Sequence, residues 1–434
     1  MGSALAEESP FSGVENFSIL TRPAEMTADG AAIVQNQSTY VFSGGGTGGH
    51  LFPGIAVAEE LLARDNAARI VFAGSERAVE TEIIADHGYD HRPLPVEPFA
   101  TLRRSPLRFA WRNWRAMRVA TQWLRREQPV VVIGLGGFAS VPIVLAASRL
   151  RIPVILLEQN VVPGRATRWL LSRAALVCLS FEATAQSLPF RCVVCVTGNP
   201  VRRRIVQLLS TSVESNPQQR PTLLVLGGSQ GAHALNAAML HAGEALREPL
   251  SGWNIVHQTG KQQAEQVRQR YEQLGMQCLV EPFFNDLPGW YRRASVVISR
   301  AGATTLAELA CAGCPAILVP YPNSLGDHQL LNARAFESAG AARIVEQHRE
   351  PNATADSLVA QLSSVLLDHS SRNKMQQAMR SLAKPQAARN VADNLLQFAH
   401  KAHGLQPVGS PHISPSSITI TPSRSNRTQQ IDHH

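Results

Sequence analysis

The residues best suited to chemistry form a glycine-rich segment near the start of the chain. Ser43-Gly44-Gly45-Gly46-Thr47-Gly48-Gly49-His50 leads through Pro53-Gly54 into an amphipathic stretch. Glycines let backbone N–H groups approach an anion closely, and the N-terminus of a following helix adds positive potential. The segment lacks a Walker A lysine and fits the dinucleotide fingerprint poorly. It predicts an anion-binding loop, with a tight strand-to-helix turn as the alternative, and His50 can exchange a proton near neutral pH.

Two more glycine segments occupy comparable places. Leu226-Gly227-Gly228-Ser229-Gln230-Gly231-Ala232 follows an apolar run, and Ser229 could donate its hydroxyl to a phosphate there. Gly134-Leu135-Gly136-Gly137-Phe138 follows another run, where a plain strand–helix connection is an almost equally good interpretation. Two such loops in matching places favour two anionic ligands that face each other.

Short β-branched runs alternate with longer amphipathic stretches between these segments. Strands separated by helices imply parallel sheets covered on both faces. Ligands of such sheets bind beyond the carboxyl ends of the strands, where the glycine loops lie. The predicted strands are 39–43, 69–73, 130–133, 153–157, 176–179, 193–196, 222–226, 253–258, 278–281, 296–299, 316–319 and 342–344.

The segment Thr197–Pro221 divides this pattern into two doubly wound α/β domains with a cleft between them. Gly198-Asn199-Pro200 breaks the chain there, a short helix follows, and Ser212–Pro221 is polar and proline-flanked. We expect a disordered N-terminal extension (1–38), a first Rossmann-like domain (39–201) and a second (202–403), then a disordered tail (404–434). The final helix of the second domain could pack back on the first.

The basic excess has one main location. Lys and Arg number 41 against 33 Asp and Glu, a formal charge of +8. Residues 102–126 hold eight Arg and no acidic residue, so the remainder of the chain is formally neutral. Trp111, Trp114, Arg108, Arg112 and Arg115 fall at helical spacing there, the chemistry of a helix that lies on an anionic membrane surface. The alternative is an ordinary domain helix with its tryptophans in the core. Nucleic-acid binding is disfavoured, because the aromatics form apolar helix stripes.

Two features suggest other classes of protein and are set aside. Between Glu127 and Arg149 lie 21 uncharged residues, but glycines and prolines interrupt them, which predicts a strand, a loop and a helix in place of a membrane span. The pairs Cys192/Cys195 and Cys311/Cys314 are too far apart for a zinc ribbon. No metal, no cofactor and no disulfide framework is expected.

The motifs in order resemble the MurG family of bacterial glycosyltransferases, which convert lipid I to lipid II in peptidoglycan synthesis. The resemblance covers about residues 39–400. Phe138 departs from it, because the family often has Tyr there. Beside the three glycine segments it rests on Glu158-Gln159-Asn160, Gly198-Asn199-Pro200-Val201-Arg202, His257-Gln258-Thr259-Gly260-Lys261, Arg300-Ala301-Gly302-Ala303 through Glu308, and Asp327-His328-Gln329 with Asn332-Ala333.

The resemblance implies a GT-B fold and a binding role for each matching residue. UDP-GlcNAc would lie mainly on the second domain, with the uracil at the backbone of Phe284, the ribose at Glu308 and the diphosphate at Ser229 and Arg202. Asn160 and Gln329 would fix the GlcNAc hydroxyls, and Gly136, Gly137 and Phe138 would line the acceptor side. The remaining implied donor contacts are Thr47, Gly48, Gly49, Ala303, Thr304, Thr305, Leu306 and Ala307.

The implied reaction transfers GlcNAc from UDP-GlcNAc to the C4 hydroxyl of MurNAc on lipid I, with inversion. His50 is the candidate base; its alternative role is to bind the acceptor diphosphate or orient its loop. The implied location is the cytoplasmic face of the bacterial inner membrane, peripherally, in company with other cell-wall synthesis and division proteins. The alternatives are another GT-B UDP-sugar transferase, such as one acting on diacylglycerol, a dinucleotide-dependent oxidoreductase, or an inactive scaffold.

Overall fold

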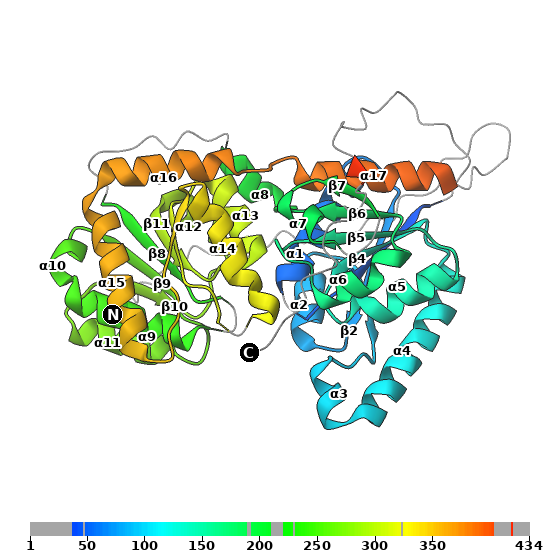
Figure 1. Ribbon diagram of the computed structural model, residues 1–434, viewed down its shortest axis with the longest axis horizontal. Coiled ribbons are helices and arrows are strands. Elements are labelled where there is room, and N and C mark those ends of the chain that lie inside the picture. Colours follow the sequence, from blue (N-terminus) through cyan, green and yellow to red (C-terminus); the bar gives the residue numbers. More distant parts are fainter. Residues whose placement is uncertain are drawn as a thin grey trace, which may run out of the picture. The chain divides into compact units, whose positions relative to one another are not determined.

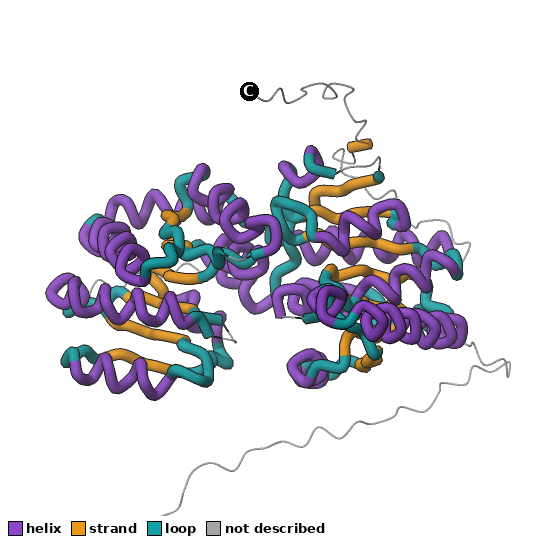
Figure 2. The backbone as a smooth tube through the Cα atoms, turned by 60° about the horizontal axis from the view of Figure 1, so that its bottom comes forward, coloured by secondary structure: helices purple, strands orange, loops and turns teal. Residues whose placement is uncertain are grey.

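The computed structural model describes residues 37–46, 48–188, 192–209, 220–228, 231–322, 324–402 and 418–419. Those from Gln37 onward belong to one compact unit that contains two sheets. Most of the two predicted tails lies outside the described residues, as do Thr47 and Ser229. Figure 2 shows the strands of each sheet between layers of helices.

The first sheet has the strand order β14-β7-β6-β5-β4-β1-β2-β3. Its pairs are parallel except for the last, in which β14 runs antiparallel to β7. Its strands are β1 (Thr39–Gly44), β2 (Arg69–Ser75), β3 (Asp90–Leu94), β4 (Val131–Gly136), β5 (Val154–Glu158), β6 (Leu176–Leu179), β7 (Val193–Val196) and β14 (Ile418–Thr419). Its helices are α1 (Gly48–Leu62), α2 (Ala78–Asp86), α3 (Ala100–Arg104), α4 (Pro106–Glu127), α5 (Ser140–Arg149), α6 (Arg165–Leu170), η1 (Leu171–Arg173) and α7 (Ala183–Gln186).

The second sheet is parallel throughout and has the order β10-β9-β8-β11-β12-β13. Its strands are β8 (Thr222–Leu226), β9 (Asn254–Gln258), β10 (Cys278–Glu281), β11 (Ala294–Ser299), β12 (Ala316–Leu318) and β13 (Ala342–Ile344). The helices are α8 (Arg203–Val206), η2 (Gln207–Leu209), α9 (His233–Ala245), α10 (Arg247–Leu250), α11 (Ala264–Gln273), α12 (Leu287–Arg293), α13 (Ala303–Ala312), η3 (Leu325–Asp327), α14 (His328–Ser338), α15 (Pro351–Leu367), α16 (His369–Ser381) and α17 (Ala387–Ala402).

Both sheets have the doubly wound order, in which the chain reverses direction next to the first strand. The predicted fold class, two Rossmann-like α/β domains, is confirmed. Each apolar run predicted as a strand overlaps an observed one. Strand β3 was not predicted, because Asp-His-Arg-Pro-Leu is polar and contains a proline; such a strand is tolerated at a sheet edge. Strand β14 was not predicted either, since it lies in a polar tail.

The final helix, α17, completes the core of the first domain. Val391 and Leu395 are fully buried, and they pack in one cluster with Tyr40 and Phe42 of β1. Figure 1 shows α16 and α17 as successive orange to red helices, of which α17 lies beside the first sheet. The first domain is therefore built from two stretches of sequence that are far apart along the chain.

The uncharged stretch after Glu127 folds as β4, a short connection and α5, as predicted. Among the described helices, none is long and apolar enough to cross a membrane.

Candidate functional site

The glycine segments lie where each sheet reverses direction. The first follows β1 and the third follows its neighbour β4; the second follows β8, and Arg300-Ala301-Gly302 follows the neighbouring β11. Ligands of doubly wound sheets bind at this point, because neighbouring loops there diverge to opposite faces of the sheet. The fold therefore places the predicted loops at its two expected ligand sites.

His50 lies in the first turn of α1 and packs against the third glycine segment. Its Nδ1 is 3.1 Å from the carbonyl oxygen of Leu135, and a Cβ on Gly136 would meet the imidazole at 3.1 Å. Because a carbonyl oxygen can only accept, Nδ1 carries the proton and donates. The lone pair of the neutral ring is then on Nε2, the state that a general base needs.

One N–H group of the first glycine loop does not face a ligand. The Gly46 N–H donates to the buried carboxylate of Glu80 at 2.5 Å, so it does not supply the anion contact that the sequence suggested. Gly48 and Gly49 begin α1. Phe138, beyond β4, lies under the guanidinium of Arg77, which is 5.2 Å from the centre of the ring.

A buried polar network centred on Asn236 lies next to the second glycine loop. Asn236 of α9 donates to the Thr259 carbonyl oxygen (3.0 Å) and to Gln263 Oε1 (2.7 Å), so its Oδ1 accepts from His257 Nε2 at 3.1 Å. Tyr271 then donates its hydroxyl to His257 Nδ1 at 3.1 Å. The histidine is thus neutral and fully hydrogen-bonded, and burial lowers its pKa to about 3.

Glu308 and Arg202 form an ion pair with each other. Glu308, on α13, is buried; its Oε1 lies 2.8 Å from Arg202 Nη2, and its Oε2 accepts from the Tyr291 hydroxyl at 3.1 Å. Burial raises the pKa of the Glu308 carboxyl, which Arg202 opposes. The guanidinium of Arg202 also stacks 4.6 Å from the ring of Phe52 on α1. The two groups expected at the ribose and the diphosphate are therefore adjacent.

Helix α13 presents its N-terminus to the site without a side-chain cap. Its N-cap is Gly302, so the N–H groups of Ala303, Thr304 and Thr305 have no capping acceptor from that residue. Thr305 and Ala307 are half-buried, whereas Leu306 faces the core. Such a terminus favours an anionic ligand.

Three hydrogen bonds link the two domains at the site. Thr304 donates its hydroxyl to the carbonyl oxygen of Gly49 at 2.7 Å. Asn332 of α14 donates to Asn160 Oδ1 at 3.1 Å and accepts from the Val161 N–H at 3.0 Å. Asn160 is thereby held next to the second domain.

The side-chain oxygen of Gln329 and the backbone N–H of Phe284 are both engaged within the protein. The Oε1 of Gln329 accepts from the Tyr321 N–H at 2.9 Å, which leaves its amide N–H₂ pointing elsewhere. The Phe284 N–H donates to Gln258 Oε1 at 3.4 Å, so a base that binds to this backbone would meet the carbonyl group.

The arginine-rich segment forms α3 and α4, and two of its tryptophans, Trp111 and Trp114, are outside the core, whereas Trp123 packs against it. Trp111 is 56% exposed, Trp114 50% and Leu107 86%. The buried face of α4 consists of Ala116, Ala120 and Leu124. The core-helix alternative is therefore wrong for these two tryptophans.

The arginines of this segment differ in their surroundings. Arg108 and Arg112 pair with Glu97 at 3.0 and 3.2 Å, and Arg112 also pairs with Glu76. Arg115 and Arg118 lie over the rings of Trp111 and Trp114. Part of the local charge is thus neutralised within the domain.

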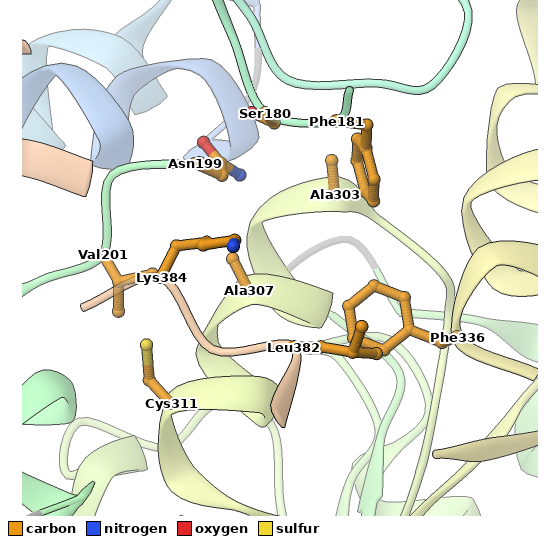
Figure 3. A pocket seen from close by; sticks show the side chains of 10 residues that line it. All are labelled: Ser180, Phe181, Asn199, Val201, Ala303, Ala307, Cys311, Phe336, Leu382 and Lys384. Atoms are coloured by element: carbon orange, nitrogen blue, oxygen red, sulfur yellow. The ribbon is translucent and has the colours of Figure 1, made fainter. Parts of the chain in front are cut away.

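A separate pocket lies beside the segments that connect the domains (Figure 3). Asn199 and Val201 line it from one connection, and Leu382 and Lys384 from the other. A Cβ on Gly198 would come 2.5 Å from that of Lys384, so this crossing requires glycine, at φ 83°. The lining includes Ala303 and Ala307 but none of the polar side chains expected to bind the sugar.

The sequence did not assign a role to several residues that support the site, and one of them was not identified at all. Buried Glu158 accepts from the N–H groups of Asn160 and Gly164, both at 3.0 Å, and thereby shapes that loop. Burial lowers the pKa of His328, near Glu158 and His50. Glu80 was missed. A carboxylate at the end of a buried strand, as in Glu158 of β5, was the one signal available, and Glu80 in α2 carries no such mark.

The sequence matches one class of protein over both domains. Residues 40–178 match the glycosyltransferase family 28 N-terminal domain, and residues 222–395 match the family 28 C-terminal domain. Two relatives bear the name UDP-N-acetylglucosamine–N-acetylmuramyl-(pentapeptide) pyrophosphoryl-undecaprenol N-acetylglucosamine transferase. That of Anaeromyxobacter sp. (strain Fw109-5) is 37% identical over 368 residues, 84% of this chain and 94% of the relative. That of Syntrophotalea carbinolica is 38% identical over 376 residues, 84% and 99%.

A solved structure agrees with these relatives. The crystal structure of Acinetobacter baumannii MurG superimposes with a TM-score of 0.65 at 30% identity and covers 83% of this chain and 99% of that one. The chain belongs to the MurG family of glycosyltransferases.

The low pKa of His257 predicts acid sensitivity of the fold. The unfolded chain, with a histidine pKa near 6.5, binds a proton below that pH that the folded chain excludes down to about pH 3. Stability therefore falls by about 1.4 kcal/mol per pH unit, or roughly 2 kcal/mol at pH 5. Urea unfolding at pH 7.5 and 5.0 should show this loss in the wild type and a smaller one in His257→Gln. The exposed His369→Gln is the control, and an equal loss in both variants would contradict the assignment.

Proposed function

We propose that the protein transfers N-acetylglucosamine from UDP-GlcNAc to the C4 hydroxyl of the N-acetylmuramyl group of lipid I, giving lipid II. The observation that carries this proposal is the hydrogen bond from Thr304 to the Gly49 carbonyl. It brings the first turn of α1, which holds His50, to the uncapped N-terminus of α13. The candidate base therefore lies next to the position from which the UDP of a bound sugar nucleotide would depart.

His50 acts as the base for the attacking hydroxyl. Its Nδ1–H is held by the Leu135 carbonyl, so Nε2 accepts the proton as the acceptor oxygen forms its bond to the anomeric carbon. Attack from the face opposite the departing UDP inverts that carbon.

The second domain binds the donor and stabilises the departing UDP. Arg202 and the N-terminal N–H groups of α13 meet the charge that develops on the diphosphate. A carboxylate has about four lone-pair positions. Glu308 uses one on Arg202 and one on Tyr291, and the others accept the two ribose hydroxyls. Ser229 would join them at the diphosphate, and the Phe284 carbonyl would meet the uracil.

The amide side chains of Asn160 and Gln329 select the sugar. Asn160 Nδ2 and Gln329 Nε2 are donors, and both side chains are only half-buried. One N–H of Asn160 Nδ2 donates to Glu158 Oε1 at 3.2 Å, so the other is the donor proposed for the sugar. Because each amide oxygen is already engaged by a protein donor, the amide orientation is fixed before the sugar binds.

The exposed faces of α3 and α4 dock on the anionic cytoplasmic surface of the inner membrane, where the acceptor resides. Exposed Leu107, Trp111 and Trp114 enter the headgroup region, and the neighbouring arginines meet the lipid charge. Gly136, Gly137 and Phe138 line the acceptor side in the same domain. Other cell-wall synthesis and division proteins would share this surface.

Transfer of radiolabelled GlcNAc from UDP-GlcNAc to a lipid I analogue tests the proposed reaction. We expect a labelled lipid II analogue and no labelled glycolipid when diacylglycerol is the only acceptor. The Glu308→Ala variant should raise the KM for UDP-GlcNAc by about 10- to 100-fold, because a charged hydrogen-bond partner is lost. Transfer to diacylglycerol alone would establish the competing reaction and overturn this proposal.

Replacement of His50 tests its role as the base. His50→Ala should lower kcat by about 10²- to 10⁴-fold, the usual contribution of general base catalysis, and leave the KM for UDP-GlcNAc nearly unchanged. The exposed His87→Ala is the matched control. An unchanged kcat, or a change confined to the KM for the acceptor, would remove the base assignment in favour of diphosphate binding.

Replacement of the exposed apolar residues of α4 tests membrane docking. The double variant Leu107→Ser/Trp111→Ser should bind vesicles that contain anionic lipid at least about tenfold more weakly, because two large apolar side chains no longer enter the interface. Leu367→Ser is the control, since Leu367 is 72% exposed but lies on α15 of the second domain. Co-sedimentation at low and high salt measures both. Equal binding by the wild type and the double variant would refute the assignment of this face.

A further inference from the structure

We propose that the first turn of α2 is a clamp that positions the catalytic glycine loop, with Glu80 as its central positioning residue. The inference rests on the proposed function, because it assigns the loop's position to the transfer step. It concerns Ser75, Arg77 and Glu80 together with the Gly46 peptide.

The clamp holds Gly46 by both of its polar groups. Glu80 Oε1 accepts from the Gly46 N–H at 2.5 Å, and Arg77 Nη1 donates to the Gly46 carbonyl oxygen at 3.1 Å. Arg77 and Glu80 also contact each other, since the Glu80 N–H donates to the Arg77 carbonyl at 3.0 Å. One helical turn therefore fixes the residue two positions before α1.

The Glu80 carboxylate is an integral part of the packing of the loop. The side chain is fully buried, and its Oε2 accepts from the Ser75 N–H at 2.8 Å. A Cβ on Gly45 would fall on the carboxylate, and one on Gly74 would come 2.6 Å from Oε2. The Glu80 carboxylate therefore occupies the space that side chains at these two positions would fill. The loop and the carboxylate fit together only in this arrangement.

This arrangement is transmitted to His50 by direct packing. A Cβ on Gly137 would come 2.6 Å from the Gly45 carbonyl oxygen, and one on Gly136 would come 3.1 Å from His50 Nδ1. The backbone of the glycine loop therefore packs against Gly137, and the backbone of Gly136 packs against the imidazole. A shift of Gly45 and Gly46 must therefore move the carbonyl of Leu135, which holds the imidazole. A displacement of about 1 Å at a reacting group can lower the rate about 10²-fold.

The two sides of the clamp differ in strength. Glu80 is buried and has no freedom to reorient, whereas Arg77 is exposed and stacks on Phe138. In Glu80→Gln, one amide nitrogen must face either the Gly46 N–H or the Ser75 N–H, because each carboxylate oxygen accepts from one of these groups. Either orientation sets two donors against each other, so the variant keeps the shape of the side chain and loses the match.

The test measures kinetics and loop protection in the full chain. Glu80→Gln should lower kcat by about 10- to 100-fold at a KM for UDP-GlcNAc within about twofold of the wild type. Arg77→Met, which has no donor, should lower kcat less, and Arg77→Lys, which keeps a donor for the Gly46 carbonyl, should recover most of the loss. Glu82→Gln, an exposed carboxylate on the same helix, is the matched control.

Amide hydrogen exchange of the peptide that contains Gly44–His50 supplies a readout independent of activity. We expect faster exchange there in Glu80→Gln than in Glu82→Gln. A wild-type chain that does not glycosylate lipid I would refute the proposed function, and the exchange comparison would still decide on the clamp. Unchanged kcat and exchange, or kcat and KM effects that merely follow a loss of melting temperature, would overturn the clamp. If Glu80→Gln does not fold, the Arg77→Met and Arg77→Lys pair decides.

Discussion

The carbonyl oxygen of Leu135 is the point on which the first-domain site depends. It accepts from His50 at 3.1 Å and from the buried amide of Gln159 at 2.9 Å, so it orients one side chain from the first turn of α1 and one from the loop after β5. This carbonyl is accessible because the pairing of β1 with β4 becomes irregular after Ser43. A Cβ on Gly44 would come 2.6 Å from that of Leu135, so the two backbones approach this closely only with glycine.

Buried carboxylates shape the loops around this point. Glu80 and Glu158 each accept backbone N–H groups, and Glu308 accepts from Arg202 and Tyr291. A buried charge is tolerated when donors of this kind satisfy it, and removal of one partner is costly. These carboxylates therefore hold the described parts of their loops within the protein, while the N-terminus of α13 has no side-chain cap. A preorganised electrostatic site requires both features, namely groups that the protein holds in place and an open position for the charge of the ligand.

The sequence predicted the framework well because burial on both faces leaves an obvious mark. Runs such as Thr222–Leu226 are continuous and apolar, and glycine segments mark their ends. It could not predict partners that are remote in sequence. The Glu308–Arg202 ion pair and the Asn160–Asn332 bond depend on how the two domains meet. The exposure of Trp111 could not be predicted for a similar reason. Helical spacing alone does not show which face of α4 packs on the core, and in the structure it is the face that carries Ala116 and Ala120.

The distribution of charge gives the two domains different tasks. Residues 102–126, which lie in α3 and α4, carry a formal charge of +8, equal to the net charge of the chain, yet Arg108 and Arg112 are paired with acidic residues of their own domain. Arg115 and Arg118 lie over the exposed tryptophans, so this surface is suited to a lipid boundary more than to a soluble diphosphate. In the proposed reaction the first domain therefore receives the lipid acceptor, and the second receives the nucleotide. In that reaction the two substrates would arrive on different domains, and the bonds Thr304–Gly49 and Asn332–Val161 would hold the acceptor hydroxyl and the anomeric carbon near each other.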